Sequence, residues 1–437
     1  MSLYPVNSPL VIVHNYLETF RNFLVRNGDD RALMARRFNG DQAVFWLGGN
    51  KLILSSAAIE NIETLSRRWG YAEVTALSPE KPSTQLSYDI LDQKYLLNAI
   101  VKHAGDQGRI TLISYAASVE LYSLIGYLES ELKIHVSTPE MPARDMLWLK
   151  HYIDSKVGFR MLVQKWIGGS HLPEGYAATT PEMILELSRF FVRAGKGVAI
   201  KANIGGSGVG NMFFTPEQIN SNDVDAAIER GDEFIPGTVY VVEELIPARD
   251  GVSPSLEFYV PEINSGPPIL TYLCNQRFEE SGRFAGVVIA PEYYQAPWYD
   301  EFKQVGEKIA AELQKAGYVG HFDIDAIIDE KGKLNLVEIN SRRTGGTYVH
   351  EFLTRQFGED YSRDYSVLSE NKIPTKFTSL EELEEQIGDL LYPIDGKKSG
   401  VIVLLTSTLM KGTFGYLIIG DSVDDVVKKR EVLIGRL

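Results

Sequence analysis

Three side chains that carry oxygen ligands are spaced so that a β-hairpin would bring them to one face. Asp325 lies in an apolar stretch, Glu338 and Asn340 lie in a second one, and the turn sequence Asp329-Glu330-Lys331-Gly332 separates the two. Because side chains alternate along a strand, Glu338 and Asn340 share a face and Asp325 can lie beside them. Two carboxylates and an amide oxygen suit Mg²⁺ held together with phosphate oxygens. The sequence therefore predicts a magnesium–phosphate site, and the alternative is that Asp323 and Asp325 flank a solvated strand edge.

Two arginines follow this hairpin, Arg342 and Arg343. A guanidinium at this position could neutralise charge that develops on a transferred phosphoryl group or on an oxyanion, which makes both candidate catalytic residues. The alternative is a surface arginine paired with nearby acids. The next turn, Thr344-Gly345-Gly346-Thr347, offers backbone N–H groups that suit a carboxylate or a phosphate.

A lysine and a glycine-rich loop lie upstream. The predicted strand over residues 198–201 ends in Lys201 and is followed by Gly205-Gly206-Ser207-Gly208. Glycines let a loop bring its N–H groups against phosphates, and the lysine supplies a point charge. A glycine-rich hairpin without a ligand is the alternative. A Walker loop is excluded, because no Gly-Lys-Ser/Thr sequence closes the segment.

A second upstream segment could contact a nucleotide base. The predicted strand over residues 239–242 runs into Glu243, Glu244, Leu245 and Ile246. Carbonyl, N–H and carboxylate groups at the end of a strand could bind the edge of an adenine ring. The alternative is a plain strand end with its acids in solvent.

The elements that must position these residues fall into more than one structural class. Residues 41–140 alternate short apolar runs with stretches of helical spacing, which indicates an α/β domain with a mostly parallel sheet. Pro139 and Pro142 mark a break, after which helices and paired strands follow. The predicted fold is therefore an α/β and α+β multidomain protein. In the N-terminal part, strands are expected over residues 43–47, 52–54 and 110–113, and a helix is expected over residues 119–128.

Composition narrows the classes of partner. Among 437 residues, 44 Lys and Arg stand against 58 Asp and Glu, a formal net charge of −14 without a basic run, so neither nucleic acid nor membrane is an expected partner. The single cysteine, Cys274, excludes an internal disulfide and a cysteine-based metal cluster, and its apolar neighbours predict a packed thiol in a strand. No signal peptide is recognised, and residues 401–420 indicate two paired strands rather than a membrane span. A cytoplasmic protein is expected.

Taken in order, these motifs resemble the ATP-grasp superfamily over residues 145–350. The resemblance implies ATP and Mg²⁺ as cofactors, and it implies a first nucleotide lysine in Asp154-Ser155-Lys156 and an acid near the ribose at Glu257. It also implies that residues 243–246 are the adenine-binding hinge, although the adjacent acids leave open whether Glu243 or Glu244 faces adenine. The implied nucleotide-binding residues are Lys156, Lys201, Gly205, Gly206, Ser207, Gly208, Glu243, Glu244, Ile246 and Glu257. Asp325, Glu338 and Asn340 are the implied metal ligands, with Arg342 and Arg343 as the catalytic candidates.

The flanking segments give a narrower resemblance, to the pheganomycin-type peptide ligases. The unit that ends in Pro139-Glu140-Met141-Pro142 is similar to their pre-ATP-grasp domain, and the segment around Gly412-Thr413-Phe414-Gly415 is similar to their C-terminal domain. The implied units are an N-terminal pre-ATP-grasp α/β domain (1–144), a small lid subdomain (145–240), a large subdomain with the metal site (241–360) and a C-terminal domain (361–437).

The resemblance also implies a reaction, the ligation of a carboxylate to an amine. A small-molecule carboxylate would attack the γ-phosphate of ATP, and an amine of an amino acid or peptide would then displace phosphate from the acyl phosphate. The alternatives are another ATP-grasp reaction, either a carboxylate–thiol ligase or a carboxylase, and a non-catalytic ATP-binding regulatory protein. A homodimer is left open. The substrate pocket is expected at the C-terminal unit and near residues 277–300, which include Arg277, Arg283, Tyr293, Tyr294 and Trp298.

Overall fold

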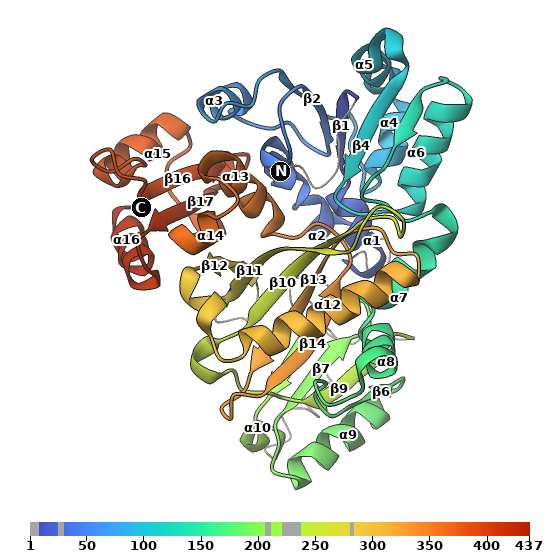
Figure 1. Cartoon of the computed structure of the whole chain (residues 1–437), viewed down its shortest axis with the longest axis vertical. Coiled ribbons are helices and arrows are strands. Elements are labelled where there is room, and N and C mark those ends of the chain that lie inside the picture. The colour runs from blue at the N-terminus through green and yellow to red at the C-terminus, as the bar shows by residue number, and fades with distance from the viewer. Residues whose placement is uncertain (1–7, 25–29, 206–210, 221–236, 280–283) are drawn as a thin grey trace.

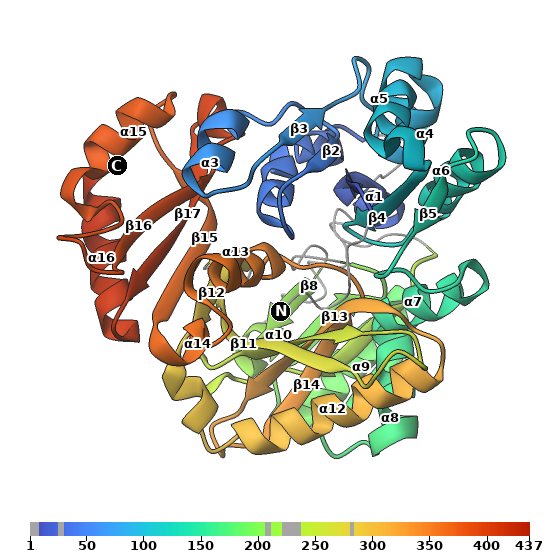
Figure 2. The same cartoon turned by 45° about the horizontal axis from the view of Figure 1, so that its top comes forward.

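Three β-sheets organise the chain. The computed structural model describes residues 8–24, 30–205, 211–220, 237–279 and 284–437. One sheet has five parallel strands, and the other two have eight and four antiparallel strands. Figures 1 and 2 show the N-terminal sheet in blue to teal, the long sheet in yellow to red, and the small sheet in green. The predicted α/β and α+β multidomain organisation is confirmed.

The N-terminal sheet has the strand order β3-β2-β1-β4-β5, with the first strand at its centre. Strands β1 and β2 are buried along their whole length, as expected for parallel strands covered on both faces. The predicted strands at 52–54 and 110–113 and the helix over 119–128 are confirmed. The strands are β1 (Leu10–His14), β2 (Lys51–Ser55), β3 (Val74–Leu77), β4 (Arg109–Ser114) and β5 (His135–Ser137), and the helices are α1 (Tyr16–Leu24), α2 (Arg31–Met34), α3 (Ile62–Arg68), α4 (Leu86–Asp92), α5 (Lys94–Ala104) and α6 (Val119–Ser130).

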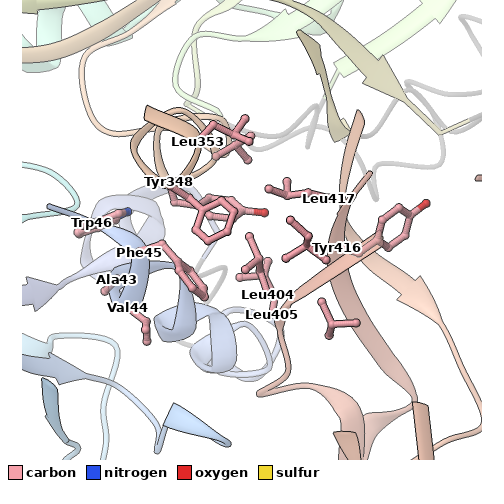
Figure 3. Close-up of a cluster of buried hydrophobic side chains, with 14 of the residues drawn as sticks. Ala43, Val44, Phe45, Trp46, Tyr348, Leu353, Leu404, Leu405, Tyr416 and Leu417 are labelled. Atoms are coloured by element: carbon pink, nitrogen blue, oxygen red, sulfur yellow. The ribbon is translucent and has the colours of Figure 1, made fainter. Parts of the chain in front are cut away.

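The strand predicted over residues 43–47 is wrong, because most of this segment belongs to a 3₁₀ helix, Arg37–Phe45. Strands β1 and β2 already have partners on both sides, so the sheet offers no free edge there. The apolar side chains instead pack between helix α13 (Thr347–Phe357) and the C-terminal strands, as Figure 3 shows. The buried ammonium of Lys51 donates to the carbonyls of Val44 (2.7 Å) and Trp46 (2.5 Å) and so satisfies backbone groups that a strand would have paired.

The eight-stranded sheet has the order β14-β13-β10-β11-β12-β15-β17-β16 and holds the predicted hairpin at one edge. Cys274 is buried in β11, and residues 401–420 form two paired antiparallel strands, as predicted. The strands are β10 (Pro254–Val260), β11 (Ile269–Phe278), β12 (Phe284–Ile289), β13 (Gly320–Ile328), β14 (Leu334–Asn340), β15 (Ser366–Pro374), β16 (Gly400–Leu405) and β17 (Thr413–Gly420). The helices around it are α7 (Leu147–Asp154), α8 (Lys156–Ile167), α12 (Tyr299–Lys315), α13, α14 (Tyr361–Asp364), α15 (Leu380–Ile387) and α16 (Val423–Arg436).

Helix α12 covers one face of this sheet because its apolar residues recur at helical spacing. Phe302, Ile309 and Leu313 are fully buried against the sheet. Gly306 allows the close approach, since a Cβ there would lie 2.9 Å from the ring of Phe258 on β10. The opposite face of the hairpin strands is therefore the one left for polar side chains.

The small sheet has the order β6-β9-β7-β8 and is packed against helix α9. The start of α9 is capped: Pro181 occupies the first turn, and the Thr180 hydroxyl accepts a 3.2 Å bond from the N–H of Met183. The elements are β6 (Gly175–Ala178), β7 (Val198–Ala202), β8 (Asn211–Phe214), β9 (Tyr240–Glu244), α9 (Pro181–Arg193) and α10 (Pro216–Asn220).

The small and large sheets extend across predicted domain boundaries but do not define where the domains end. Strand β9 belongs to the small sheet and runs to Glu244, beyond residue 240. Strand β15 pairs with β12, so the large sheet continues across residue 361. The division at residues 144, 240 and 360 stays a proposal. Within the described part of the chain, no helix has the length and apolar character needed to cross a membrane.

Candidate active site

The hairpin of β13 and β14 brings the predicted acids together. Asp325 lies opposite Glu338, and Asp323 lies opposite Asn340, with an irregularity in the register after Asp325. Strand β13 lies inside the sheet between β14 and β10, so Asp323 and Asp325 are only 6% and 4% exposed. The alternative of a solvated strand edge is therefore excluded.

The oxygens of these acids converge on one amide nitrogen. Asn340 Nδ2 donates to Asp323 Oδ1 at 2.9 Å, to Asp325 Oδ2 at 3.2 Å and to Glu338 Oε1 at 3.4 Å. Asp325 Oδ1 is buried and has no hydrogen-bond partner among the described residues. The ammonium of Lys156 pairs with Glu338 Oε2. The amide nitrogen of Asn340 and the ammonium of Lys156 thus bring one partial and one full positive charge to these acids. A bound cation would neutralise the same acids.

The titration of these acids reflects their crowding. Burial, followed by the charge of Glu338, raises the pKa of Asp325 to about 7. Burial, followed by the charge of Asp325, raises the pKa of Asp323 well above its usual range. Burial also opposes ionisation of Glu338, but the adjacent Lys156 ammonium holds the pKa of Glu338 below its usual value. A divalent cation would remove the repulsion that raises the first two pKa values.

The donor set fits magnesium only in part. Among the described residues, no group of three or more acidic, histidine or cysteine side chains is arranged to hold a metal ion. Asp325 and Glu338 supply carboxylate oxygens, whereas Asn340 Oδ1 accepts a 2.6 Å bond from Arg342 and does not face the acids. Two carboxylates suit a hard cation that takes its further oxygen ligands from a phosphate, and the predicted ligand set of Asp325, Glu338 and Asn340 stays a prediction.

The predicted first lysine is placed by a residue that the sequence analysis missed. Helix α8 begins at Lys156, where the N–H of Lys156 donates to Asn203 O (2.8 Å) and the N–H of Val157 donates to Asn203 Oδ1 (2.9 Å). Asn203 directly follows β7, so it ties the strand of the second lysine to the helix of the first. An asparagine between a strand and a glycine-rich loop was the available signal.

The second lysine shares a face of the small sheet with Glu243. Lys201 Nζ pairs with Glu243 Oε1, and Arg160 Nη1 donates to Glu243 Oε2 at 2.9 Å. Glu244 points to the other face, where it pairs with Lys196. Of the two acids that the sequence left open, Glu243 is the one on the side of Lys201. Ile246 lies half-buried beyond the end of β9, Gly205 lies three residues beyond the end of β7, and Gly206, Ser207 and Gly208 lie outside the described residues.

Glu257 is buried and already has hydrogen-bond partners. Its carboxylate is 1% exposed and accepts bonds from Thr347 Oγ1 (2.6 Å) and Thr344 Oγ1 (3.1 Å), while the ring of His321 lies 3.1 Å away. These contacts occupy both oxygens beneath the loop that follows β14. Glu257 is not on the wall of the cavity described below, and its role near the ribose stays a prediction.

The two arginines have different positions. Arg342 lines the cavity and donates to Asn340 Oδ1. Arg343 is 1% exposed, and its guanidinium binds Glu140 through two bonds of 2.8 and 2.6 Å and lies 3.0 Å from Glu351. The side chain links the hairpin loop to the break after the N-terminal sheet, and a catalytic role for Arg343 stays a prediction. The surface-pair alternative fails, because this pair is buried.

Two backbone N–H groups of the turn at residues 344–347 already donate hydrogen bonds within the turn. The N–H of Thr344 donates to Thr347 Oγ1 (2.8 Å), and the N–H of Gly346 donates to Thr344 Oγ1 (3.3 Å). Glycine is required here by close packing, since a Cβ at Gly346 would lie 2.2 Å from the hydroxyl of Tyr272. The prediction of a flexible anion-binding turn is corrected for these two N–H groups.

One cavity connects the metal-site residues with the C-terminal strands. It measures about 760 Å³, and its walls include Lys201, Asp325, Glu338, Asn340 and Arg342 among the predicted residues. Of the expected substrate residues, only Arg277 is placed on this wall. Tyr293, Tyr294 and Trp298 pack in the core beside β11 and α12, and Arg283 lies outside the described residues.

Comparisons with known proteins identify the fold of the chain. No family model matches the chain, and no curated protein matches its sequence. N5-carboxyaminoimidazole synthetase from Staphylococcus aureus shares 12% identity with a TM-score of 0.56, over 99% of this chain and 98% of that one. Biotin carboxylase from Campylobacter jejuni shares 11% identity with a TM-score of 0.57, over 98% and 91%. Both are ATP-grasp enzymes. The chain has the ATP-grasp fold.

A third structure supports the same fold. The biotin carboxylase domain of Hydrogenobacter thermophilus 2-oxoglutarate carboxylase, in complex with MgADP, ADP and bicarbonate, shares 14% identity with a TM-score of 0.55, over 98% of this chain and 90% of that one. The predicted ATP-grasp fold is therefore confirmed. Such low identities establish the fold alone, so the roles of individual residues must be argued from the geometry of the site.

Proposed function

We propose that the protein is an ATP-dependent ligase that joins a carboxylate to an amine through an acyl phosphate and releases ADP and phosphate. The observation that carries the proposal is one cavity wall that holds Lys201, Arg342 and the acids Asp325 and Glu338. The complex of a structural neighbour with MgADP is consistent with this use of the fold. ATP and Mg²⁺ are therefore the proposed cofactors.

Each residue has a role that its chemistry supports. Lys201 would hold phosphate oxygens of ATP as a point charge, and Lys156 would exchange its bond to Glu338 for a phosphate when magnesium binds. Asp325 and Glu338 would hold the magnesium, which would neutralise charge on the phosphate oxygens, and Asn340 would join them after its amide turned its oxygen toward the acids. Arg342 would stabilise the negative charge that develops during transfer.

The reaction balances without a protein nucleophile. A carboxylate oxygen of the acyl donor forms a bond to the γ-phosphorus, and the bond from that phosphorus to the bridging oxygen breaks, which releases ADP. The amine then attacks the carbonyl carbon and loses a proton, and the acyl carbon–oxygen bond breaks to release phosphate. What the site must provide is orientation and charge stabilisation, and these are the terms that dominate phosphoryl transfer.

A carboxylase is the second candidate, because the structural neighbours named above are a carboxyaminoimidazole synthetase and biotin carboxylases. In that reaction bicarbonate would replace the organic carboxylate as the acyl donor. A carboxylate–thiol ligase would use a thiol in place of the amine, and a regulatory ATP-binding protein would release no ADP.

One experiment separates these candidates. The protein is incubated with Mg·ATP, hydroxylamine and a mixture of organic carboxylates, and both ADP and hydroxamate are measured. We expect both products to form together, and we expect Lys201→Ala to abolish both, while Lys165→Ala, an exposed lysine on α8, leaves them unchanged. ADP release that requires bicarbonate and gives no hydroxamate would establish the carboxylase. Nucleotide binding without ADP release, across all donors and with thiols as acceptors, would refute an enzyme.

A further inference from the structure

Two arginines and one buried acid form a cluster on the cavity wall away from the metal-site residues. Glu370 on β15 is 2% exposed, and its Oε2 accepts a 2.7 Å bond from Arg430 Nε on α16. The same oxygen accepts a bond from the Tyr416 hydroxyl. Arg277 Nη2 on β11 lies 3.5 Å from Glu370 Oε1, which is beyond good hydrogen-bond length. All three charged residues line the cavity.

This cluster has more cationic donors than acceptors. One carboxylate faces two guanidiniums, which leaves one positive charge in excess, and each guanidinium carries five N–H donors. Arg277 Nε is buried and has no hydrogen-bond partner among the described residues. A buried donor without an acceptor costs free energy, and an anionic group of a ligand would remove that cost. Glu370 fixes Arg430 in place, so the second anion would meet a preformed site.

The cluster is too far from the acids for the reacting group itself to bind there. Four strand spacings separate β13, which carries Asp325, from β15, which carries Glu370, so the two backbones lie about 19 Å apart. Apolar side chains, among them Phe284 and Val287 of β12, line the cavity between them. A ligand that reaches both ends is therefore elongated, with an apolar middle and an anionic end.

We propose that Arg277 and Arg430 form a subsite for a terminal carboxylate of a substrate, at the end opposite to the one that reacts. The choice of a carboxylate follows from the fork geometry of the guanidinium, which accommodates two oxygens side by side. The carboxylate can belong to the amine substrate, as in an amino acid or a peptide, or it can be a second carboxylate of the acyl donor. The reacting end rests on the proposed function, whereas the anion subsite does not.

The test measures binding, so it is independent of turnover. Two probe pairs are titrated calorimetrically into the protein with Mg·ADP: the dipeptide Phe-Phe against its C-terminal amide, and suberate against its monoamide. We expect the wild type to bind the free carboxylate of at least one pair about 10- to 100-fold more tightly than the amide, because a charge-assisted bond is lost in the amide. The pair that shows the preference identifies which substrate carries the carboxylate.

Variants locate the preference. Arg277→Met is expected to bind both members of that pair equally, whereas Arg109→Met, an exposed arginine at the start of β4, keeps the wild-type ratio. The two affinities of a probe pair are compared within the same variant, so a general loss of stability does not change their ratio. The proposal is overturned if the wild type shows no preference in either pair, if Arg277→Met retains it, or if Arg342→Met abolishes it while Arg277→Met does not. If the wild type prefers the free carboxylate but forms neither hydroxamate nor ADP, the proposed function is rejected. The proposed subsite is then still supported.

Discussion

Replacement of Glu338 by glutamine tests the metal site most directly. The change keeps the size of the side chain and removes one of the two carboxylates that are proposed as metal ligands. In the free protein the Lys156 ammonium pairs with Glu338 Oε2, and an amide oxygen can still accept that bond. The change also removes a negative charge that faces Asp325 across the hairpin. The two effects oppose each other, so we expect the free energy of unfolding to change by no more than about 1–2 kcal/mol.

The effect on the loaded site should be much larger. Loss of a group that merely supports a metal ligand costs about 10- to 100-fold in metal affinity. Glu338 is proposed as a ligand itself, and Asn340 presents its nitrogen to the acids, which leaves Asp325 as the other proposed carboxylate ligand. We therefore expect magnesium to support nucleotide binding with at least 100-fold lower affinity in Glu338→Gln. This corresponds to a loss of about 2.7 kcal/mol or more of binding free energy.

The assay is calorimetric titration of a non-hydrolysable ATP analogue at a series of magnesium concentrations. The matched control is Glu330→Gln, which makes the same change in charge on the same hairpin but at the exposed turn. The control should follow the wild-type curve. Wild-type magnesium dependence in Glu338→Gln would refute the assignment of the hairpin acids as the cation site.

Three further predictions concern the frame of the site. Arg343→Met should lower the free energy of unfolding by about 3–5 kcal/mol, measured by denaturant titration, because it removes the guanidinium that binds the buried Glu140 carboxylate and leaves His321 as its remaining cationic partner. Burial raises the pKa of Glu18 from 4.5 to about 7, so the folded state binds the extra proton and loses stability as pH rises through this window. Free energies of unfolding measured at several pH values should show that Glu18→Gln removes about 3 kcal/mol of this pH dependence. A stability curve that runs parallel to that of the wild type would contradict the prediction. Gly346→Ala should destabilise by about 1–3 kcal/mol through its clash with Tyr272, whereas Gly126→Ala, in open space on α6, should raise thermal stability.

Local periodicity determined much of the fold from the sequence. Alternation in the two strands around Asp325 and Glu338 was enough to predict their pairing, because a hairpin is made from neighbouring residues and a short turn. The antiparallel pair of β16 and β17 was predicted for the same reason. The resemblance of the ordered motifs to the ATP-grasp superfamily also predicted the fold.

Contacts between distant segments decided the rest. Residues 43–47 have the composition of a strand but lie mostly in a 3₁₀ segment, because β1 and β2 are already paired on both sides and α13 offers an apolar surface. Arg342 and Arg343 are neighbours with the same chemistry, yet one lines the cavity and the other is sealed against Glu140, about 200 residues earlier in the chain. The sequence by itself determined which residues could bind phosphate and a cation. Which of them reach the cavity depended on burial and on partners that only the tertiary structure brings together.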